Sequence, residues 1–98
     1  MSIPKDKTKE YILCASIKYD DIIINGRRHK DCYIILRQFK PNIKEEDEPG
    51  REYQGFLTSK NRYVTRKEAF NIAKEQEQII HHMFDDDLIG ELVSEDLY

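Results

Sequence analysis

Two short segments of the chain contain the residues best able to bind an anion. They are Arg27, Arg28 and His29 in the first segment, and Thr65 and Arg66 in the second. Each segment is expected to begin a helix, where free backbone N–H groups and the helix dipole favour a negative charge. Arginine adds bidentate hydrogen bonds to phosphate oxygens, and histidine can donate as well. The pattern indicates a phosphate or diphosphate site, with a solvated basic turn and plain helix capping as the alternatives.

A further candidate, Phe56, could recognise a nucleobase. It follows Gly55 in a short predicted strand, where the glycine permits close approach and the aromatic ring can stack on a base. Basic residues alone do not distinguish a nucleotide from pyrophosphate, and a stacking ring would supply that discrimination. An ordinary phenylalanine of the hydrophobic core is the alternative.

The patterns that would support catalysis are weak. His29 and Cys32 have the spacing of a base and a nucleophile on one helix, but no recognisable oxyanion-stabilising group accompanies them. His82 and Asp86 could hold a metal ion at i, i+4 spacing, although such runs usually form a solvated helix end. Paired His-x-Ser/Thr motifs, typical of metal-independent phosphodiesterases, are absent from the sequence. We therefore expect a binding protein with no catalytic residues, no metal and no cofactor, rather than an enzyme.

Length and composition limit the chain to one small domain. It has 98 residues, of which 39% are hydrophobic and 36% charged, so it can build only a modest core. Its two cysteines make no disulfide framework, and no apolar run is long enough for a signal peptide or a membrane span. These features predict a cytoplasmic protein that does not contact a membrane.

The net charge of −3 conceals a strong asymmetry. Residues 1–44 carry ten Lys or Arg and five Asp or Glu, whereas residues 45–98 carry six and fourteen. A long nucleic acid usually requires a broad basic surface, which an acidic chain lacks, so we expect no long nucleic acid as a partner. Compact basic clusters on an acidic protein are better suited to a small anion.

The apolar pattern predicts a small antiparallel sheet. Residues 1–9 are a polar N-terminal lead-in that is expected to fray, and residues 10–98 form a single ligand-binding domain. Alternating side chains predict a central strand at 11–19, which a turn at 20–21 joins to a strand at 22–24 as a hairpin. Two further short strands are predicted at 55–57 and 62–64.

Two helices complete the predicted α+β fold, one short and one longer. The first runs from His29 to Phe39, with a strand over residues 33–36 as the alternative. Its buried face is expected to carry the apolar residues at i, i+3, i+4, i+7 spacing, which are Cys32, Ile35, Leu36 and Phe39. The second begins at a capping box formed by Thr65 and Glu68, and an apolar stripe extends it to Met83.

The composition of the C-terminal tail predicts that the protein forms oligomers. It mixes acidic residues with apolar ones, which are Leu88, Ile89, Leu92, Val93, Leu97 and Tyr98. A domain this small has more apolar surface than one modest sheet can cover. We therefore expect the tail to dock, and the protein to form a homodimer or a higher oligomer with the tail contributing to the contact.

Four motifs, in order and spacing, resemble those of a known family. Residues 24–31 contain a Gly-x-Arg-His motif, and residues 54–56 are Gln-Gly-Phe. Residues 62–73 match an aromatic-x-x-Arg-x-Glu-Ala-x-x-Ile-Ala helix start. Residues 92–98, Leu-Val-Ser-Glu-Asp-Leu-Tyr, resemble a Leu-Phe-Ser-Glu-Asn/Asp-Leu-Tyr terminus. Over residues 11–98 the chain resembles a family of small phage immune-evasion proteins, of which the anti-Thoeris cyclic ADP-ribose sponge is the characterised example.

The resemblance implies non-catalytic sequestration. A TIR-domain enzyme of the bacterial host converts NAD to a cyclised ADP-ribose messenger, and the phage protein binds that messenger intact in the host cytoplasm. Relatives assemble as dimers and larger oligomers, and some also hold cyclic oligonucleotides of CBASS immunity. The triple isoleucine at 22–24 and the acidic loop at 45–48 depart from the family pattern. The resemblance therefore does not identify which messenger is bound. The alternatives are an acidic inhibitor that binds a host factor and a small phosphodiesterase that uses His29.

Overall fold

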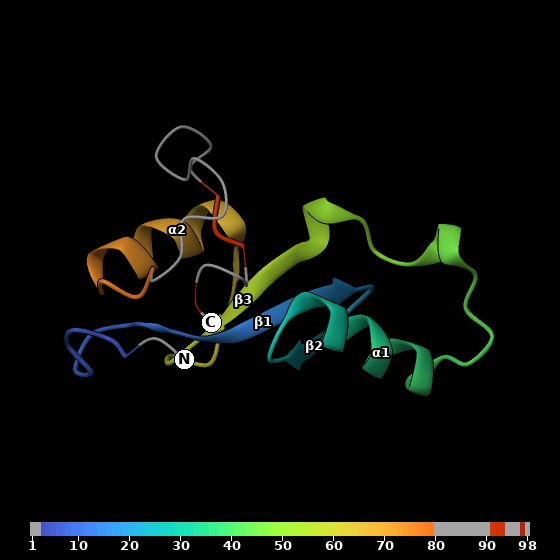
Figure 1. The fold of residues 1–98 in the computed structure, drawn as a ribbon. Coiled ribbons are helices and arrows are strands. Elements are labelled where there is room, and N and C mark those ends of the chain that lie inside the picture. Colours follow the sequence, from blue (N-terminus) through green and yellow to red (C-terminus); the bar gives the residue numbers. More distant parts are fainter. Residues whose placement is uncertain (1–2, 80–90, 94–96, 98) are drawn as a thin grey trace.

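The chain folds into an antiparallel sheet with two helices, which is the predicted α+β class (Figure 1). The computed structural model describes residues 3–79, 91–93 and 97. Four strands lie in the order β2-β1-β3-β4. Helix α1 packs against β2 and β1, and α2 packs mainly against β3 and β4, so the helices divide the sheet between them. Within the described ranges, neither helix is both long and apolar enough to span a membrane.

The central strand is β1 (Ile12–Tyr19), as its two apolar faces predicted. It pairs antiparallel with β2 (Ile22–Gly26) on one side and with β3 (Gln54–Thr58) on the other. The predicted turn joins β1 to β2, and Asp20 adopts a φ of 51° there, a conformation in which Asp is enriched. The short strand β4 (Tyr63–Thr65) pairs with β3 and completes the sheet.

One face of the sheet carries the hydrophobic core. The pairing register places four buried side chains of the four strands on this face, namely Ile24, Ala15, Phe56 and Val64. Both helices add to the same cluster, α1 with Cys32 and Leu36 and α2 with Ala69, Phe70 and Ala73. Burial against a shared sheet face therefore fixes both helices in place.

Helix α1 (His29–Phe39) begins and ends at the predicted residues, so the alternative of a strand is wrong. Its buried face differs from the prediction. His29, Cys32 and Leu36 are buried, whereas Ile35 and Phe39 are 41% and 61% exposed. Because a residue advances about 100° around a helix, Ile35 and Phe39 lie on the flank of the stripe that faces the sheet.

Helix α2 (Arg66–Glu75) begins at the predicted capping box. The Glu68 backbone N–H donates to the Thr65 hydroxyl at 3.2 Å, and the Thr65 N–H donates to the Glu68 carboxylate at 3.1 Å. The helix ends well before Met83, because Glu77 adopts a φ of 55°. Helices α1 and α2 thus have 11 and 10 residues, rather than one being short and the other long.

A tertiary contact explains why α2 stops while its apolar stripe continues. The Gln78 backbone N–H donates to the Ala73 carbonyl at 2.8 Å, which closes a Schellman-type helix end. The buried Gln78 side chain then pairs with the backbone of Ile12, accepting from its N–H and donating to its carbonyl at 2.9 Å each. This pairing satisfies both backbone groups of Ile12. Ile80 and Met83 lie outside the described residues.

The N-terminal lead-in is held against the end of α2, so the expectation that it frays is wrong. The Gln76 side-chain amide donates to the carbonyls of Asp6 and Glu10 at 2.8 and 3.0 Å, and its oxygen accepts from the Asp6 N–H at 2.8 Å. The Lys5 N–H donates to the Gln76 carbonyl at 2.9 Å. One buried glutamine therefore fixes the path of the chain that precedes β1.

The described part of the C-terminal tail docks on the domain, as predicted. Leu92 and Leu97 are 0% and 2% exposed, and the Leu92 N–H donates to the Arg66 carbonyl at 3.0 Å. Leu88, Ile89 and Tyr98 lie outside the described residues. The buried leucines are thus covered by their own chain, which weakens the argument that the tail forms a contact between subunits.

Candidate functional site

The structure brings the two predicted segments together at Gly55 in β3. His29, the first residue of α1, donates from Nε2 to the Gly55 carbonyl at 2.8 Å. Thr65, the N-cap of α2, is paired with Gly55 in the β3–β4 ladder. Segments 36 positions apart in sequence therefore place two helix N-termini beside the same strand residue. Each helix dipole contributes positive partial charge here, and the carboxylates of Asp31 and Glu68 in the first turns lie against it.

His29 has a structural role that its sequence pattern did not show. Its side chain is only 8% exposed, and its ring meets the Phe56 ring edge-on at 5.1 Å. A carbonyl oxygen can only accept, so Nε2 carries the hydrogen of this bond. This nitrogen is therefore committed to anchoring α1 on β3, and it does not point toward a ligand.

Phe56 lies in the core and not at a ligand surface. Its side chain is fully buried, so it offers no ring face on which a base could stack. The prediction of a stacking platform is wrong, and the alternative of a core phenylalanine is the one that the structure supports. Position 55 also requires glycine for a structural reason. A Cβ there would lie 2.6 Å from the Tyr63 ring and closer still to the Val64 carbonyl oxygen.

Arg66 lies at the start of α2, in a small hollow on the protein surface. Its guanidinium contacts the Glu91 carboxylate at 2.9 Å, and its side chain is only 12% exposed. The hollow has a volume of about 190 Å³ and is lined by Arg51, Glu52, Gln54, Thr65, Arg66, Lys67 and Glu91. These seven residues include three cations and two glutamates, so their net charge is +1 although the whole chain is acidic.

Several residues that line this hollow were not predicted from the sequence. Arg51 and Gln54 come from the segment before and at the start of β3, and Glu91 comes from the C-terminal tail. Nothing in their local sequence indicates a site, because the register of β3 against β4 places Gln54 near Thr65, and the path of the tail places Glu91 there. Thr65 was found through its capping motif, and its hydroxyl is indeed used as the cap.

The remaining predicted residues, Arg27 and Arg28, lead into α1. Arg28 is the N-cap, and its backbone N–H donates to the Asp31 carboxylate at 3.1 Å. Arg27 is exposed and Arg28 half-buried. Neither arginine lines the hollow at Arg66, so the structure does not bring these two predicted residues together with Thr65 and Arg66 in one pocket.

The Cys32 thiol, one of the two residues considered for catalysis, lies in the core. Burial raises the pKa of the Cys32 thiol to about 12, with the nearby Cys14 and Asp31 adding to the shift. A thiol with this pKa is protonated at neutral pH and is a poor nucleophile. No cluster of metal-ligating side chains occurs within residues 3–79, 91–93 and 97. His82 and Asp86 lie outside these ranges.

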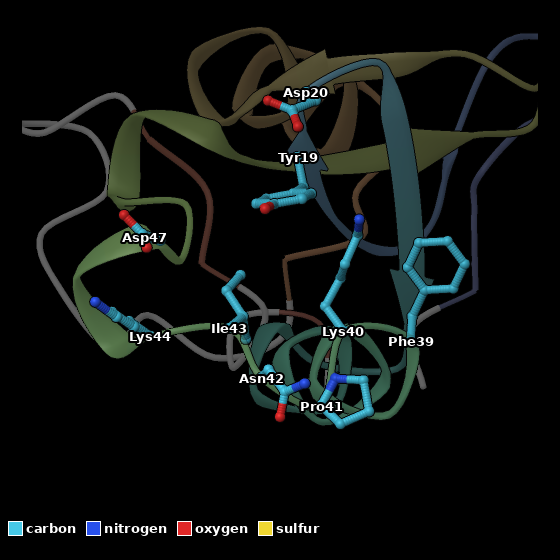
Figure 2. A pocket seen from close by; sticks show the side chains of 9 residues that line it. All are labelled: Tyr19, Asp20, Phe39, Lys40, Pro41, Asn42, Ile43, Lys44 and Asp47. Atoms are coloured by element: carbon cyan, nitrogen blue, oxygen red, sulfur yellow. The ribbon is translucent and has the colours of Figure 1, made fainter.

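A larger hollow lies at the opposite end of α1 (Figure 2). Its volume is about 590 Å³, and two aromatic rings, Tyr19 and Phe39, lie on either side of Lys40. The remaining lining residues are Asp20, Pro41, Asn42, Ile43, Lys44 and Asp47. Its two lysines face two aspartates, and the C-terminus of α1 adds negative partial charge. An anion is therefore less favoured here than at the helix N-termini.

Comparison with known proteins gives one match. The sequence model of the family described as phage T4 y16D protein matches residues 11–98. Neither the curated proteins nor the solved structures give a significant match.

Proposed function

The chain belongs to the phage T4 y16D protein family, and we propose that it is a phage anti-defence protein that sequesters a cyclic nucleotide messenger of the bacterial host. The ligand is of the cyclic ADP-ribose type, and the protein holds it without cleaving it, in the host cytoplasm. The resemblance of four sequence motifs to the cyclic ADP-ribose sponges supports this function.

The observation that carries the proposal is the convergence of the two helix N-termini at Gly55. His29 anchors the start of α1 to the same residue that pairs with Thr65, the cap of α2. The dipole of α2 and the Arg66 guanidinium then favour a phosphate group in the hollow, whereas no residue of α1 lines it. A hollow of about 190 Å³ has room for one phosphate group, with the rest of the ligand lying over the rim near Arg51 and Lys67.

Glu91 holds the position that the ligand phosphate would take. Its carboxylate contacts the Arg66 guanidinium at 2.9 Å, so an anionic ligand must displace it. An internal carboxylate of this kind keeps the arginine oriented while the site is empty. The competition also predicts that removing the charge of Glu91 strengthens ligand binding.

Non-catalytic binding fits the described residues better than hydrolysis. The Nε2 atom of His29 is committed to Gly55, and the Cys32 thiol is buried with a raised pKa. The alternative of a phosphodiesterase that uses His29 would need this imidazole to leave its core contact with Phe56. The alternative of an acidic protein-binding inhibitor gains no specific observation from the described part of the tail.

Titration calorimetry with cyclic ADP-ribose on two matched variants tests the site. Arg66→Ala removes a charge-assisted hydrogen bond of about 1.5–3 kcal/mol, so the affinity should fall roughly 10-fold to 100-fold. Arg37→Ala is the control, because Arg37 also pairs with a glutamate, Glu48, but at the far side of α1. The Arg37→Ala variant should bind cyclic ADP-ribose with the affinity of the wild type.

Glu91→Gln sharpens the same test in the opposite direction. The neutral amide no longer competes with the ligand for Arg66, and the affinity should rise roughly 2-fold to 5-fold, the usual worth of a partly exposed ion pair. Equal affinities in the wild type, Arg66→Ala and Glu91→Gln would contradict the placement of the site at the start of α2.

A further inference from the structure

The hollow between the C-terminus of α1 and the β1–β2 turn has a fixed wall (Figure 2). The wall is the turn that follows the helix, in which the Lys40 N–H donates to the Leu36 carbonyl at 2.7 Å and the Ile43 N–H donates to the Lys40 carbonyl at 3.1 Å. Ile43 from this wall and Tyr19 from β1 both pack against the hydrophobic core. The volume of about 590 Å³ lies within the range of small-molecule sites, which are usually formed before the ligand binds.

Two aromatic rings line the hollow. Tyr19 is half-buried and Phe39 is 61% exposed, and Figure 2 shows them on either side of Lys40. Aromatic rings favour contact with another ring in an edge-on or offset arrangement. The space between Tyr19 and Phe39 is therefore suited to an aromatic ring of a ligand.

The hollow is also lined by charged side chains of both signs. They are Asp20, Lys40, Lys44 and Asp47. Within the residues that the structure describes, none of these four side chains forms a hydrogen bond or an ion pair. By contrast, the arginines at positions 37, 62 and 66 each pair with a glutamate. The unpaired charges of this hollow are thus available to a ligand.

Lys44 and Asp47 show this availability most directly. The Asp47 N–H donates to the Lys44 carbonyl at 2.9 Å, so the two residues are neighbours in one turn. Their side chains nevertheless form no ion pair with each other. A ligand that carries an ammonium group and a carboxylate on adjacent atoms can contact both of them at once.

The balance of charge identifies the class of ligand. Two lysines and two aspartates line the hollow, so an ion of either sign is attracted by one pair and repelled by the other. The C-terminus of α1 adds negative partial charge, which favours an ammonium group at this end of the helix. A zwitterion complements both pairs, whereas a simple anion or cation complements only one.

We propose that this hollow binds an aromatic amino acid as a zwitterion. Its ring lies between Tyr19 and Phe39, its ammonium group contacts the two aspartates, and its carboxylate contacts the two lysines. The hollow shares no lining residue with the hollow at Arg66. Binding here is therefore independent of the cyclic nucleotide proposed for that site, and each proposal can fail without the other.

Three probes with the same phenyl ring test the charge pattern. L-phenylalanine carries both charges at pH 7, whereas phenylethylamine carries only the ammonium group and phenylpropionate carries only the carboxylate. Amide NMR titrations of the wild type measure the three dissociation constants. Each singly charged probe should bind roughly 5-fold more weakly than L-phenylalanine, which is the upper worth of a partly exposed ion pair.

Two double variants assign the charges. Lys40→Gln/Lys44→Gln should weaken binding of L-phenylalanine roughly 5-fold and should not weaken binding of phenylethylamine. Asp20→Asn/Asp47→Asn should weaken binding of L-phenylalanine to a similar extent and should not weaken binding of phenylpropionate. Asparagine also adopts the positive φ of position 20, which is 51°.

A control variant removes one charge of each sign from exposed positions outside the hollow. Lys30→Gln/Glu75→Gln should bind L-phenylalanine with the affinity of the wild type. No binding of L-phenylalanine by the wild type, equal affinities for the three probes, or unchanged binding of L-phenylalanine in both double variants would overturn the proposal. A control that binds as weakly as the double variants would overturn it as well.

Discussion

Two regions of this small domain differ in how far their apolar side chains are buried. Around Gly55 and Phe56 the core is closed, with the Phe56 ring fully buried and His29 bonded to the Gly55 carbonyl. At the outer edge of β2, which pairs only with β1 among the described strands, Ile22 and Ile23 are each 38% exposed, on opposite faces of the sheet. The comparison shows that the chain has enough apolar residues to close its core, and that others stay exposed, among them Ile22 and Ile23 on β2.

The closed region around Gly55 and the open edge of β2 are expected to contribute differently to stability. The closed region fixes the starts of both helices, and its rigidity positions the arginines proposed to bind the ligand. Ile22 and Ile23 at the outer edge of β2 are partly exposed, so substitutions there remove less buried apolar contact. Variants in the closed region should therefore lower the free energy of unfolding more than variants at the open edge of β2 do.

The largest expected effect is that of Gly55→Ala, which breaks the closed region directly. The added Cβ would lie 2.6 Å from the Tyr63 ring and even closer to the Val64 backbone oxygen, and backbone cannot move aside cheaply. We expect the free energy of unfolding, measured in urea, to fall by about 3 kcal/mol. Gly50→Ala is the control, because its Cβ would meet only the end of the flexible Glu52 side chain, and it should be nearly neutral.

A pair of phenylalanine variants compares the two regions with one substitution. Phe56→Leu removes volume from a fully buried site and should lower the free energy of unfolding by about 1–2 kcal/mol. Phe39→Leu changes a side chain that is 61% exposed and should leave the melting temperature of the monomer unchanged. Melting curves by circular dichroism at low protein concentration measure both effects. An equal decrease in melting temperature in the two variants would contradict the distinction between the regions.

The smallest effect concerns an ion pair at the other end of β3. Hydrogen bonds from Arg62, and secondarily from Thr58, lower the pKa of Glu10 to about 2 from an ordinary value of 4.5. Because the folded-state pKa is lowered, this contribution to stability is complete above pH 4.5 and is lost as the pH falls toward 2.

Glu10→Gln removes that contribution, and it should lower the melting temperature at pH 7 by roughly 4 °C. The difference between variant and wild type should shrink as the pH falls from 4.5 toward 2. Thermal melts across this pH range measure it. A difference that stays constant with pH would show that the ion pair does not stabilise the fold.

Local patterns in the sequence predicted the elements well. The alternation along β1, the helical spacing of α1 and the capping box at Thr65 and Glu68 each depend on neighbouring residues, and each is present. The end of α2 was not predictable in this way. The apolar stripe continues, but the pairing of Gln78 with Ile12, 66 positions away, stops the helix.

The candidate site shows the same limit. The sequence located the two basic helix starts, and the register of β3 brings them together at Gly55. It could not show that Phe56 points into the core, because a single aromatic residue on a short strand has no pattern that tells its two faces apart. Nor could it pair Arg66 with Glu91, since that contact depends on the path of the tail.

The central claim is that the protein binds a cyclic nucleotide and holds it intact. The most direct measurement is to incubate the protein with cyclic ADP-ribose, remove unbound ligand, denature the complex by heat and identify the released molecule by mass spectrometry. The proposal predicts that the wild type returns the unaltered cyclic messenger and that Arg66→Ala returns little or none. Release of a linear, hydrolysed product, or of no nucleotide from the wild type, would contradict the claim.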